Sequence, residues 1–307
     1  MKISVAICTW NRSRLLDQTL ESISKLKIPP KLDWELIVVD NNSTEPAVPF
    51  VLADWRKKLP LKILIEKEQG HSAARNCAVN HSSGDYIIWT DNDVLVSENW
   101  LSGYVEAFRN HPEMAFFGGE IKPRFEHPRP AWIQETWKIC SPVFATRELG
   151  ETAIELGLDR LPYGANFAIR ADVQRRFAYD TQWGRKKTSM VGEDEVAVLR
   201  QVIQDGGRGL WVPGAKLEHF IPPDRATPQY IAAYYFGQGY AKAFKGKTNR
   251  PRILTWADAV LSSLSYQFHR RLSRPKTWVS KLVHSNLCWG ELSGLREIKN
   301  NPAAVAP

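Results

Sequence analysis

Apolar residues in the first 110 positions follow two alternating patterns. Short runs that are apolar almost throughout predict buried strands over residues 3–9, 35–40, 61–65 and 86–90. Between these runs, apolar residues recur every three or four positions, which predicts helices over residues 13–23, 48–59, 72–80 and 97–110. Strands that alternate with helices in this way predict an α/β fold, with a mostly parallel sheet flanked by helices.

The second half of the chain is less regular. Residues 122–162 contain prolines and aromatic residues without a clear period, and we expect a long connection that shapes a pocket. Further on, the pattern predicts strands over 164–170, 209–213 and 215–219, a helix over 193–203, and a helix that Thr227 caps and Pro228 begins. From about residue 246 the chain is basic and the alternation stops. We therefore place a domain boundary between 1–245 and a basic, mostly helical C-terminal appendage over 246–307.

Composition narrows the class of protein. The 307 residues are 43% hydrophobic and 24% charged, as in ordinary globular proteins. A formal net charge of +8 favours anionic partners. The four cysteines are scattered and form no CxxC pair, which argues against disulfides and against a cysteine metal site. The pattern shows neither a signal peptide nor a membrane-spanning run, so we expect a cytoplasmic protein.

Polar side chains follow several predicted strands at the point where each strand ends. Thr9 and Asn11 come after the first strand, Asp40 ends the second, and Asp-Asn-Asp at 91–93 follows the fourth. Because the carboxyl ends of parallel strands meet at one edge of a sheet, the sequence predicts a ligand site there. Acids held just past a buried strand suit Mn²⁺ or Mg²⁺, which bind oxygen ligands. An isolated D-x-D pattern, however, more often marks a turn or the start of a helix.

Three other groups of residues have both a structural and a chemical interpretation. Glu193, Asp194 and Glu195 open a helix, where acids stabilise the helix dipole, and one of them could instead act as a general base. Adjacent helical positions point in different directions, so we expect only one of the three to face a substrate. His219 is a surface or structural histidine, or a metal ligand. Arg75 is a solvated side chain, or binds an anion at its helix start.

The motifs are more specific in combination than alone. In order, the chain contains TWNR at 9–12, VVDNNS at 38–43, GHSAARN at 70–76, GDYIIWTDND at 84–93, GANFAIR at 164–170 and GEDE at 192–195. This order resembles glycosyltransferase family 2, and the resemblance covers about residues 1–225. It implies a GT-A fold, a Rossmann-like nucleotide-binding architecture, with a nucleotide-sugar-binding half over 1–120 and an acceptor-binding half over 121–245.

The resemblance also implies roles for individual residues. The nucleotide-sugar-binding residues would be Thr9, Asn11, Arg12, Asp40, Asn42, Gly70, Arg75, Asp91 and Asn92. Asp93 would hold the divalent metal, Mn²⁺ or Mg²⁺, with His219 as a further ligand. Asp194 would be the catalytic base with Glu193 as its neighbour, and the sugar or acceptor side would include Asn166 and Trp183.

These roles imply an inverting transferase that moves a sugar from a nucleotide sugar, expected to be UDP-linked, to a hydroxyl of a glycan or lipid-linked acceptor. Cell-surface or other glycan biosynthesis is the expected setting. Two alternatives stay open: a nucleotidyltransferase acting on sugar phosphates, and a non-catalytic nucleotide-sugar-binding protein. The G-x-G-x-x-G of a Rossmann oxidoreductase is absent. Nucleic acid is not an expected partner, because carboxylates at the strand ends repel phosphate unless a metal is present.

The C-terminal segment has two interpretations. Trp256, Val260, Leu264 and Phe268 lie at helical spacing, and four basic residues follow them, at 270, 271, 274 and 276. We expect a helix whose apolar face packs on the catalytic domain. The alternative is a basic amphipathic segment that makes a peripheral contact with an anionic membrane, on its inner, cytoplasmic face.

Overall fold

The structure is a computed structural model that describes residues 1–181, 194–244, 246 and 250–300. The chain forms two compact units. Among the described residues, the first unit contains 1–124, 145–181 and 194–220, and the second contains 125–144, 221–244, 246 and 250–300. Residues 221–244 thus belong to the same compact unit as the C-terminal helices, whereas we expected them in the domain formed by residues 1–245. The domain boundary near residue 245 stays a prediction.

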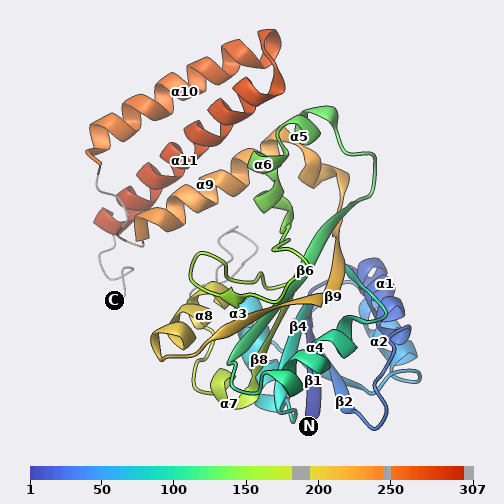
Figure 1. Ribbon diagram of the computed structural model, residues 1–307. Coiled ribbons are helices and arrows are strands. Elements are labelled where there is room, and N and C mark those ends of the chain that lie inside the picture. Colours follow the sequence, from blue (N-terminus) through green and yellow to red (C-terminus); the bar gives the residue numbers. More distant parts are fainter. Residues whose placement is uncertain (182–193, 245, 247–249, 301–307) are drawn as a thin grey trace. The chain divides into compact units, whose positions relative to one another are not determined.

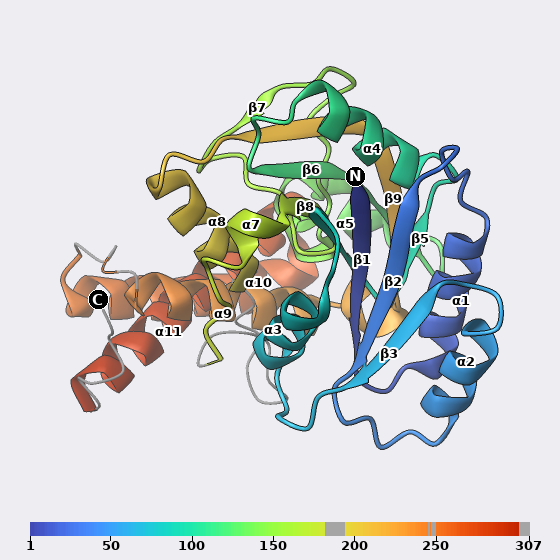
Figure 2. The same cartoon turned by 90° about the horizontal axis from the view of Figure 1, so that it is seen from below.

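The first unit is built on one mixed sheet (Figures 1 and 2). Its strands run in the order β3-β2-β1-β4-β8-β6-β9-β5, and β7 pairs with β9. Their bounds are β1 Lys2–Thr9, β2 Asp33–Asp40, β3 Leu61–Ile65, β4 Tyr86–Asp91, β5 Val94–Val96, β6 Phe116–Phe125, β7 Glu155–Leu156, β8 Asn166–Arg170 and β9 Gly209–Ile221. The pairs that join β3, β2, β1 and β4 are parallel, whereas β8 pairs antiparallel with both β4 and β6.

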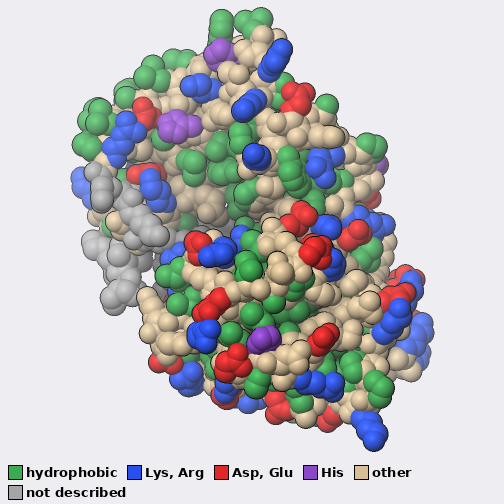
Figure 3. Space-filling view, viewed as in Figure 1, with side chains coloured by type: hydrophobic (Ala, Val, Ile, Leu, Met, Phe, Trp, Pro, Cys, Tyr) green, Lys and Arg blue, Asp and Glu red, His purple; other side chains and the backbone are tan. Residues whose placement is uncertain are grey.

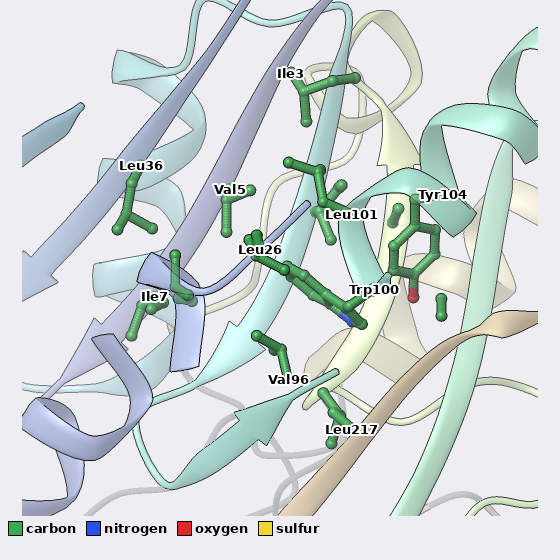
Figure 4. Packing of buried hydrophobic residues seen from close by; sticks show 14 of the residues in the cluster. Ile3, Val5, Ile7, Leu26, Leu36, Val96, Trp100, Leu101, Tyr104 and Leu217 are labelled. Carbon is green, nitrogen blue, oxygen red and sulfur yellow. The ribbon is translucent and has the colours of Figure 1, made fainter. Parts of the chain in front are cut away.

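Helices cover both faces of this sheet (Figure 2). Their bounds are α1 Ser13–Ser24, α2 Ala47–Trp55, α3 His71–His81, α4 Trp100–Asn110, α7 Ala171–Gln174 and α8 Asp194–Gln204. Side chains alternate along each strand, so Val5 faces α1, α2 and α4 whereas Ala6 faces α3, α7 and α8. Trp100 is fully buried between the sheet and the helices on the α1, α2 and α4 side, and Figure 4 shows it among the apolar side chains of that side. The strand register brings Thr9 opposite Asp40, and Cys8 opposite Asp91, so these strands end at one edge of the sheet.

The predicted fold class is confirmed: the chain is α/β, with a parallel core and helices on both faces. Strand β6 is missing from the prediction because Gly118-Gly119 and Pro123 interrupt its apolar pattern. The two short strands predicted near residue 214 are one strand, β9. The expected long connection contains β7 and short helices: α5 Ala131–Glu135, α6 Trp137–Cys140 and the 3-10 helix Ser141–Phe144.

The second unit contains three long helices: α9 Pro228–Phe244, α10 Arg252–Leu272 and α11 Pro275–Asn300, preceded by the 3-10 helix Pro223–Ala226. The predicted cap of α9 is confirmed, because Thr227 Oγ1 accepts a hydrogen bond from the Tyr230 N–H. Helix α11 packs against both α9 and α10. A Cβ on Gly239 of α9 would lie 2.0 Å from a carbonyl oxygen of α11, so only glycine permits this approach.

The apolar residues that were expected to pack in α10 are largely exposed. Trp256, Leu264 and Phe268 are 50%, 64% and 63% exposed. The buried positions of α10 are instead the small side chains of Thr255, Ala259 and Ser262. The packing predicted for this apolar face is therefore wrong. Among the helices described, none is long and apolar enough to cross a membrane.

Candidate active site

Two loops of the predicted site are joined through Asn11. Its backbone N–H donates to Ser43 Oγ at 2.7 Å, and its side-chain oxygen accepts the N–H groups of Thr44 and Glu45 at 2.9 Å. Asn11 and Arg12 both adopt left-handed backbone conformations, with φ values of 58° and 61°. This turn reverses the chain between β1 and α1. Asn11 thus holds the loop after β1 against the loop after β2.

The acid that ends β2 is buried at the same edge. Asp40 Oδ1 accepts the Ser43 N–H at 3.0 Å, and the side chain of Thr9, at the end of β1, accepts a hydrogen bond from Asn92 Nδ2 at 2.7 Å. Asn42 is exposed and left-handed, with φ 61°. The structure therefore brings Thr9, Asp40 and Asn92 to one edge, as the sequence predicted. Their contacts with a nucleotide stay a prediction.

Asn41 is a buried residue of this edge that the sequence analysis did not select. Its side-chain nitrogen donates to the carbonyls of Glu66 and Glu68, and its side-chain oxygen accepts the Gly70 N–H at 2.8 Å. Gly70 has φ 155°, which favours glycine, and it begins the turn into α3. Asn41 thus positions the start of α3. In the sequence, nothing distinguishes Asn41 from Asn42 beside it.

A group of three side chains could hold a metal ion. Ligand atoms of Asp91, Asp93 and His219 all lie within 4.8 Å of one another. Two ligands of one Mg²⁺ or Mn²⁺ ion lie at most about 4.2 Å apart, so a small closing movement would complete the site. Two carboxylates and an imidazole suit either ion. Asp91, which we expected on the ribose side, therefore joins Asp93 and His219 as a candidate ligand.

Pairing between distant strands places the histidine of this group. Strand β5 pairs antiparallel with β9 so that Val94 lies opposite His219, and the Phe220 N–H donates to the Asp93 carbonyl at 2.8 Å. His219 Nε2 consequently lies 3.4 Å from Asp93 Oδ1. Arg12 Nη1 donates to Asp93 Oδ2 at 2.7 Å and supplies positive charge beside this carboxylate.

A second cluster forms where the starts of α3 and α8 meet. His71 Nδ1 lies 3.0 Å from Asp194 Oδ2, and Arg75 Nη1 lies 3.4 Å from the same oxygen. Arg75 Nη1 also lies 3.5 Å from Glu195 Oε2. The expectation that Asp194 and Glu195 point in different directions is therefore wrong, because both reach Arg75. His71 was not selected from the sequence, although its spacing of four from Arg75 places both on one helix face.

The two carboxyl groups have opposite pKa shifts. Burial alone would raise the pKa of Asp194, but the positive charges of Arg75 and His71 outweigh it and hold that pKa well below its usual range. Burial, together with the charge of Asp194, raises the pKa of Glu195 to about 8. At neutral pH, Asp194 is therefore an ionised carboxylate and Glu195 a protonated acid beside it.

Arg75 is enclosed rather than solvated. Its side chain is 2% exposed, and its guanidinium carbon lies 5.1 to 5.6 Å from the ring centres of Trp89, Phe167 and Tyr179. A Cβ on Gly164 would lie 2.5 Å from Arg75 Nη2, so glycine leaves the space that this guanidinium fills. The expectation of a solvated arginine is wrong, and a contact of Arg75 with a diphosphate stays a prediction.

The two clusters are neighbours. Cys8 lies opposite Asp91 in the β1–β4 pair, and burial raises the pKa of its thiol to about 12. The charges of Arg75, Asp91 and Asp194 all act on this thiol, so Cys8 lies close enough to both clusters to be affected by their charges.

Asn166 is a fully buried member of the core. Its side-chain oxygen accepts from Trp100 Nε1 and the Tyr104 hydroxyl, and its nitrogen donates to the carbonyls of Glu120 and Ala215. All four hydrogen bonds of the amide are made with protein groups, so the predicted role beside the sugar finds no support in these contacts. Trp183, the other residue predicted on that side, and Glu193, predicted beside the catalytic base, lie outside the described residues.

The sequence matches known proteins over most of its length. The profile of the family described as glycosyl transferase family 2 matches residues 4–172, more than half of the chain. The succinoglycan biosynthesis protein ExoM of Rhizobium meliloti is 25% identical over 246 residues, which cover 78% of this chain and 73% of that protein. The glucosyl-dolichyl phosphate glucuronosyltransferase of Haloferax volcanii is 28% identical over 251 residues, covering 79% and 76%.

Solved structures share the fold. The mannosyltransferase PcManGT of Pyrobaculum calidifontis, in complex with GDP-Man and Mn²⁺, has a TM-score of 0.56 at 17% identity, covering 99% of this chain and 76% of that one. Residues 1–349 of S. aureus TarS, in complex with UDP-GlcNAc, have a TM-score of 0.54 at 15% identity, covering 99% and 92%. These similarities confirm the predicted GT-A fold. Together with the profile match, they establish that the chain belongs to glycosyl transferase family 2, a family of glycosyltransferases that use nucleotide-sugar donors.

Proposed function

We propose that this protein is an inverting, metal-dependent glycosyltransferase that transfers a sugar from a UDP-linked donor to an acceptor hydroxyl. One observation carries the proposal: the candidate metal ligands and the ionised Asp194 lie close enough for the charge of Asp91 to act on Arg75, which contacts Asp194. The first group suits a metal-bound diphosphate, and the second suits removal of a proton.

The donor side would be held by the strand-end residues. Thr9, Asp40 and Asn92 line the edge that receives the nucleoside, and Asp91, Asp93 and His219 would hold the metal. When bound, the metal would supply positive charge that stabilises the nucleoside diphosphate as it leaves. Arg12, whose side chain is about half exposed, would add positive charge on the same side.

The acceptor side would use Asp194. As the acceptor oxygen forms its bond to the anomeric carbon, its proton passes to the Asp194 carboxylate. The bond from that carbon to the diphosphate oxygen breaks, and its electron pair leaves with the diphosphate. One displacement of this kind inverts the anomeric centre and needs no enzyme nucleophile. His71 and Arg75 would fix the orientation of the base and keep it ionised.

The relatives support the chemical class of both substrates. The TarS structure contains UDP-GlcNAc and the PcManGT structure contains GDP-Man. Both support a nucleoside diphosphate sugar as the donor, and the choice of uridine is the more specific claim of this proposal. The Haloferax relative is named for a dolichyl phosphate-linked substrate, which supports a glycan or lipid-linked acceptor here. Membership of the family favours glycosyl transfer over both alternatives, a nucleotidyltransferase and a non-catalytic binding protein.

A panel of nucleotide sugars, screened by thermal unfolding with and without Mn²⁺, tests the donor proposal. A true donor at about 100 times its dissociation constant should add about 2.7 kcal/mol to the free energy of unfolding. Asp93→Ala should lose the Mn²⁺-dependent part of this gain. Asp54→Ala, a matched exposed acid on α2, should keep it. A gain that is equal in Asp93→Ala and the native protein would overturn the metal assignment.

A further inference from the structure

Helix α10 has its large apolar side chains on the outside. The positions that it buries are Thr255, Ala259 and Ser262, which are small. Its exposed large apolar residues are Ile253, Leu254, Trp256, Leu261, Leu264, Phe268 and Leu272. A helix adapted only to water would have the reverse arrangement, because burying apolar area is the main source of stability. The outer face of α10 is therefore built to contact something apolar.

Most of these exposed residues lie along one stripe of the helix. Leu261, Leu264, Phe268 and Leu272 are between 63% and 71% exposed, and their spacing of three and four places them on one side of the helix. Thr255, Ala259 and Ser262 point the other way, which is the side of α10 available to α11. In the space-filling view, apolar and basic side chains lie together over the α10 region (Figure 3). Contiguous apolar patches of this kind mark interaction sites.

Positive charge accompanies the stripe. Residues 250–276 contain six basic side chains and a single acid, Asp258, which pairs with Arg250. Four of the basic residues lie around the C-terminal end of the stripe, and all of them are exposed: Arg270, Arg271, Arg274 and Lys276. The partner should therefore combine an apolar interior with negative charge at its surface.

We propose that the outer face of α10 docks on an anionic membrane surface, with its apolar stripe in the headgroup region and its basic end on lipid phosphates. Trp256 and Phe268 are side chains that favour this interface. A second copy of the chain fits less well, because its stripe would bring the same positive charges. No described helix can span a membrane, so the contact is a surface contact.

Co-sedimentation of the full chain with vesicles tests this docking. The vesicles contain phosphatidylcholine alone or with 30% phosphatidylserine, at low and at high salt. The native chain should sediment with the anionic vesicles only, and less at high salt. Each basic residue contributes about fivefold in affinity, so the triple variant Arg270→Gln, Arg271→Gln, Arg274→Gln should bind about 100-fold more weakly.

The apolar stripe has its own variants and control. Leu264→Gln with Phe268→Gln should abolish sedimentation and leave the thermal unfolding temperature unchanged, since both side chains are exposed. Phe50→Gln, which replaces a 73% exposed apolar residue on α2, should bind as the native chain does. A native chain that stays in solution at low salt would overturn the proposal. Sedimentation velocity that shows a dimer, lost in the stripe variant, would assign the face to a second copy and overturn it also.

Discussion

Replacing Gly164 by alanine tests whether the space around Arg75 controls the position of Asp194, the proposed base. The added Cβ would lie 2.5 Å from Arg75 Nη2 and 3.2 Å from Glu195 Cδ. Carbon and nitrogen atoms in contact normally lie about 3.5 Å apart, so the guanidinium would have to move by about 1 Å. Arg75 is buried among three aromatic rings and two carboxylates, which leaves it no open space to enter.

Two effects should follow from this displacement. Overpacking of a core side chain costs about 1–3 kcal/mol of the free energy of unfolding, which urea denaturation measures. Because Arg75 contacts Asp194, the proposed base should move with it, and misplacement by about 1 Å costs about 10²-fold in rate. The single-turnover rate of sugar transfer measures this loss. Donor affinity should fall less than the rate, because the candidate metal ligands are not displaced.

Gly214→Ala is the matched control. A Cβ at Gly214 would meet its nearest atom at 3.7 Å, an ordinary contact, so stability should change by no more than about 1 kcal/mol and the rate should stay native. If Gly164→Ala behaved like this control, the space around Arg75 would not be limiting. If it lost stability but kept its transfer rate, Arg75 would stabilise the fold without positioning the base.

Four further substitutions probe the site. Asp194→Asn should fold and bind donor as the native protein does but transfer sugar about 10²–10⁴ times more slowly; a native rate in a direct transfer assay would exclude it as base. Glu195→Gln should become more stable relative to the native protein as pH rises. The folded Glu195 keeps its proton to about pH 8, whereas the unfolded acid releases its proton near pH 4.5, so the native fold loses stability between these two pH values. Urea denaturation at pH 6 and pH 9 measures this, and an equal difference at both values would contradict the shift. His219→Ala should weaken Mn²⁺-dependent donor binding less than Asp93→Ala in calorimetry, because two carboxylates remain. Asn166→Ala leaves the Trp100 N–H and Tyr104 hydroxyl without their acceptor, so the free energy of unfolding should fall by about 3 kcal/mol or more; a loss below 1 kcal/mol would argue against its structural role.

The parallel half of the fold was predictable because its strands and helices are local patterns. Residues 3–9 and 86–90 are apolar runs that end in polar residues, and both strands formed where expected. Strand β6 was not predictable in the same way, since Gly118-Gly119 contributes no apolar side chains to its pattern. That strand gains its place from pairing with β8, a contact that sequence spacing does not reveal.

The positions of several candidate residues were predictable from the sequence, whereas most of their contacts were not. Asp93 and His219 were expected to share a metal, and the register of β5 and β9 brings them together. The role of Arg75 was not foreseen, because its partners Asp194 and Glu195 lie about 120 positions away. A motif such as GHSAARN identifies candidate functional residues. It does not show which carboxylate each of them will meet.

Burial of Arg75 makes the residues at four positions depend on one another. Loss of the arginine alone would leave two carboxyl groups buried beside each other, and a side chain at Gly164 would displace it. Loss of Asp194 would leave the positive charge of Arg75 uncompensated, and loss of Glu195 would leave the guanidinium without one of its contacts. A single substitution at position 75, 164, 194 or 195 should therefore be unfavourable. We expect relatives either to keep all four residues or to have exchanged them together.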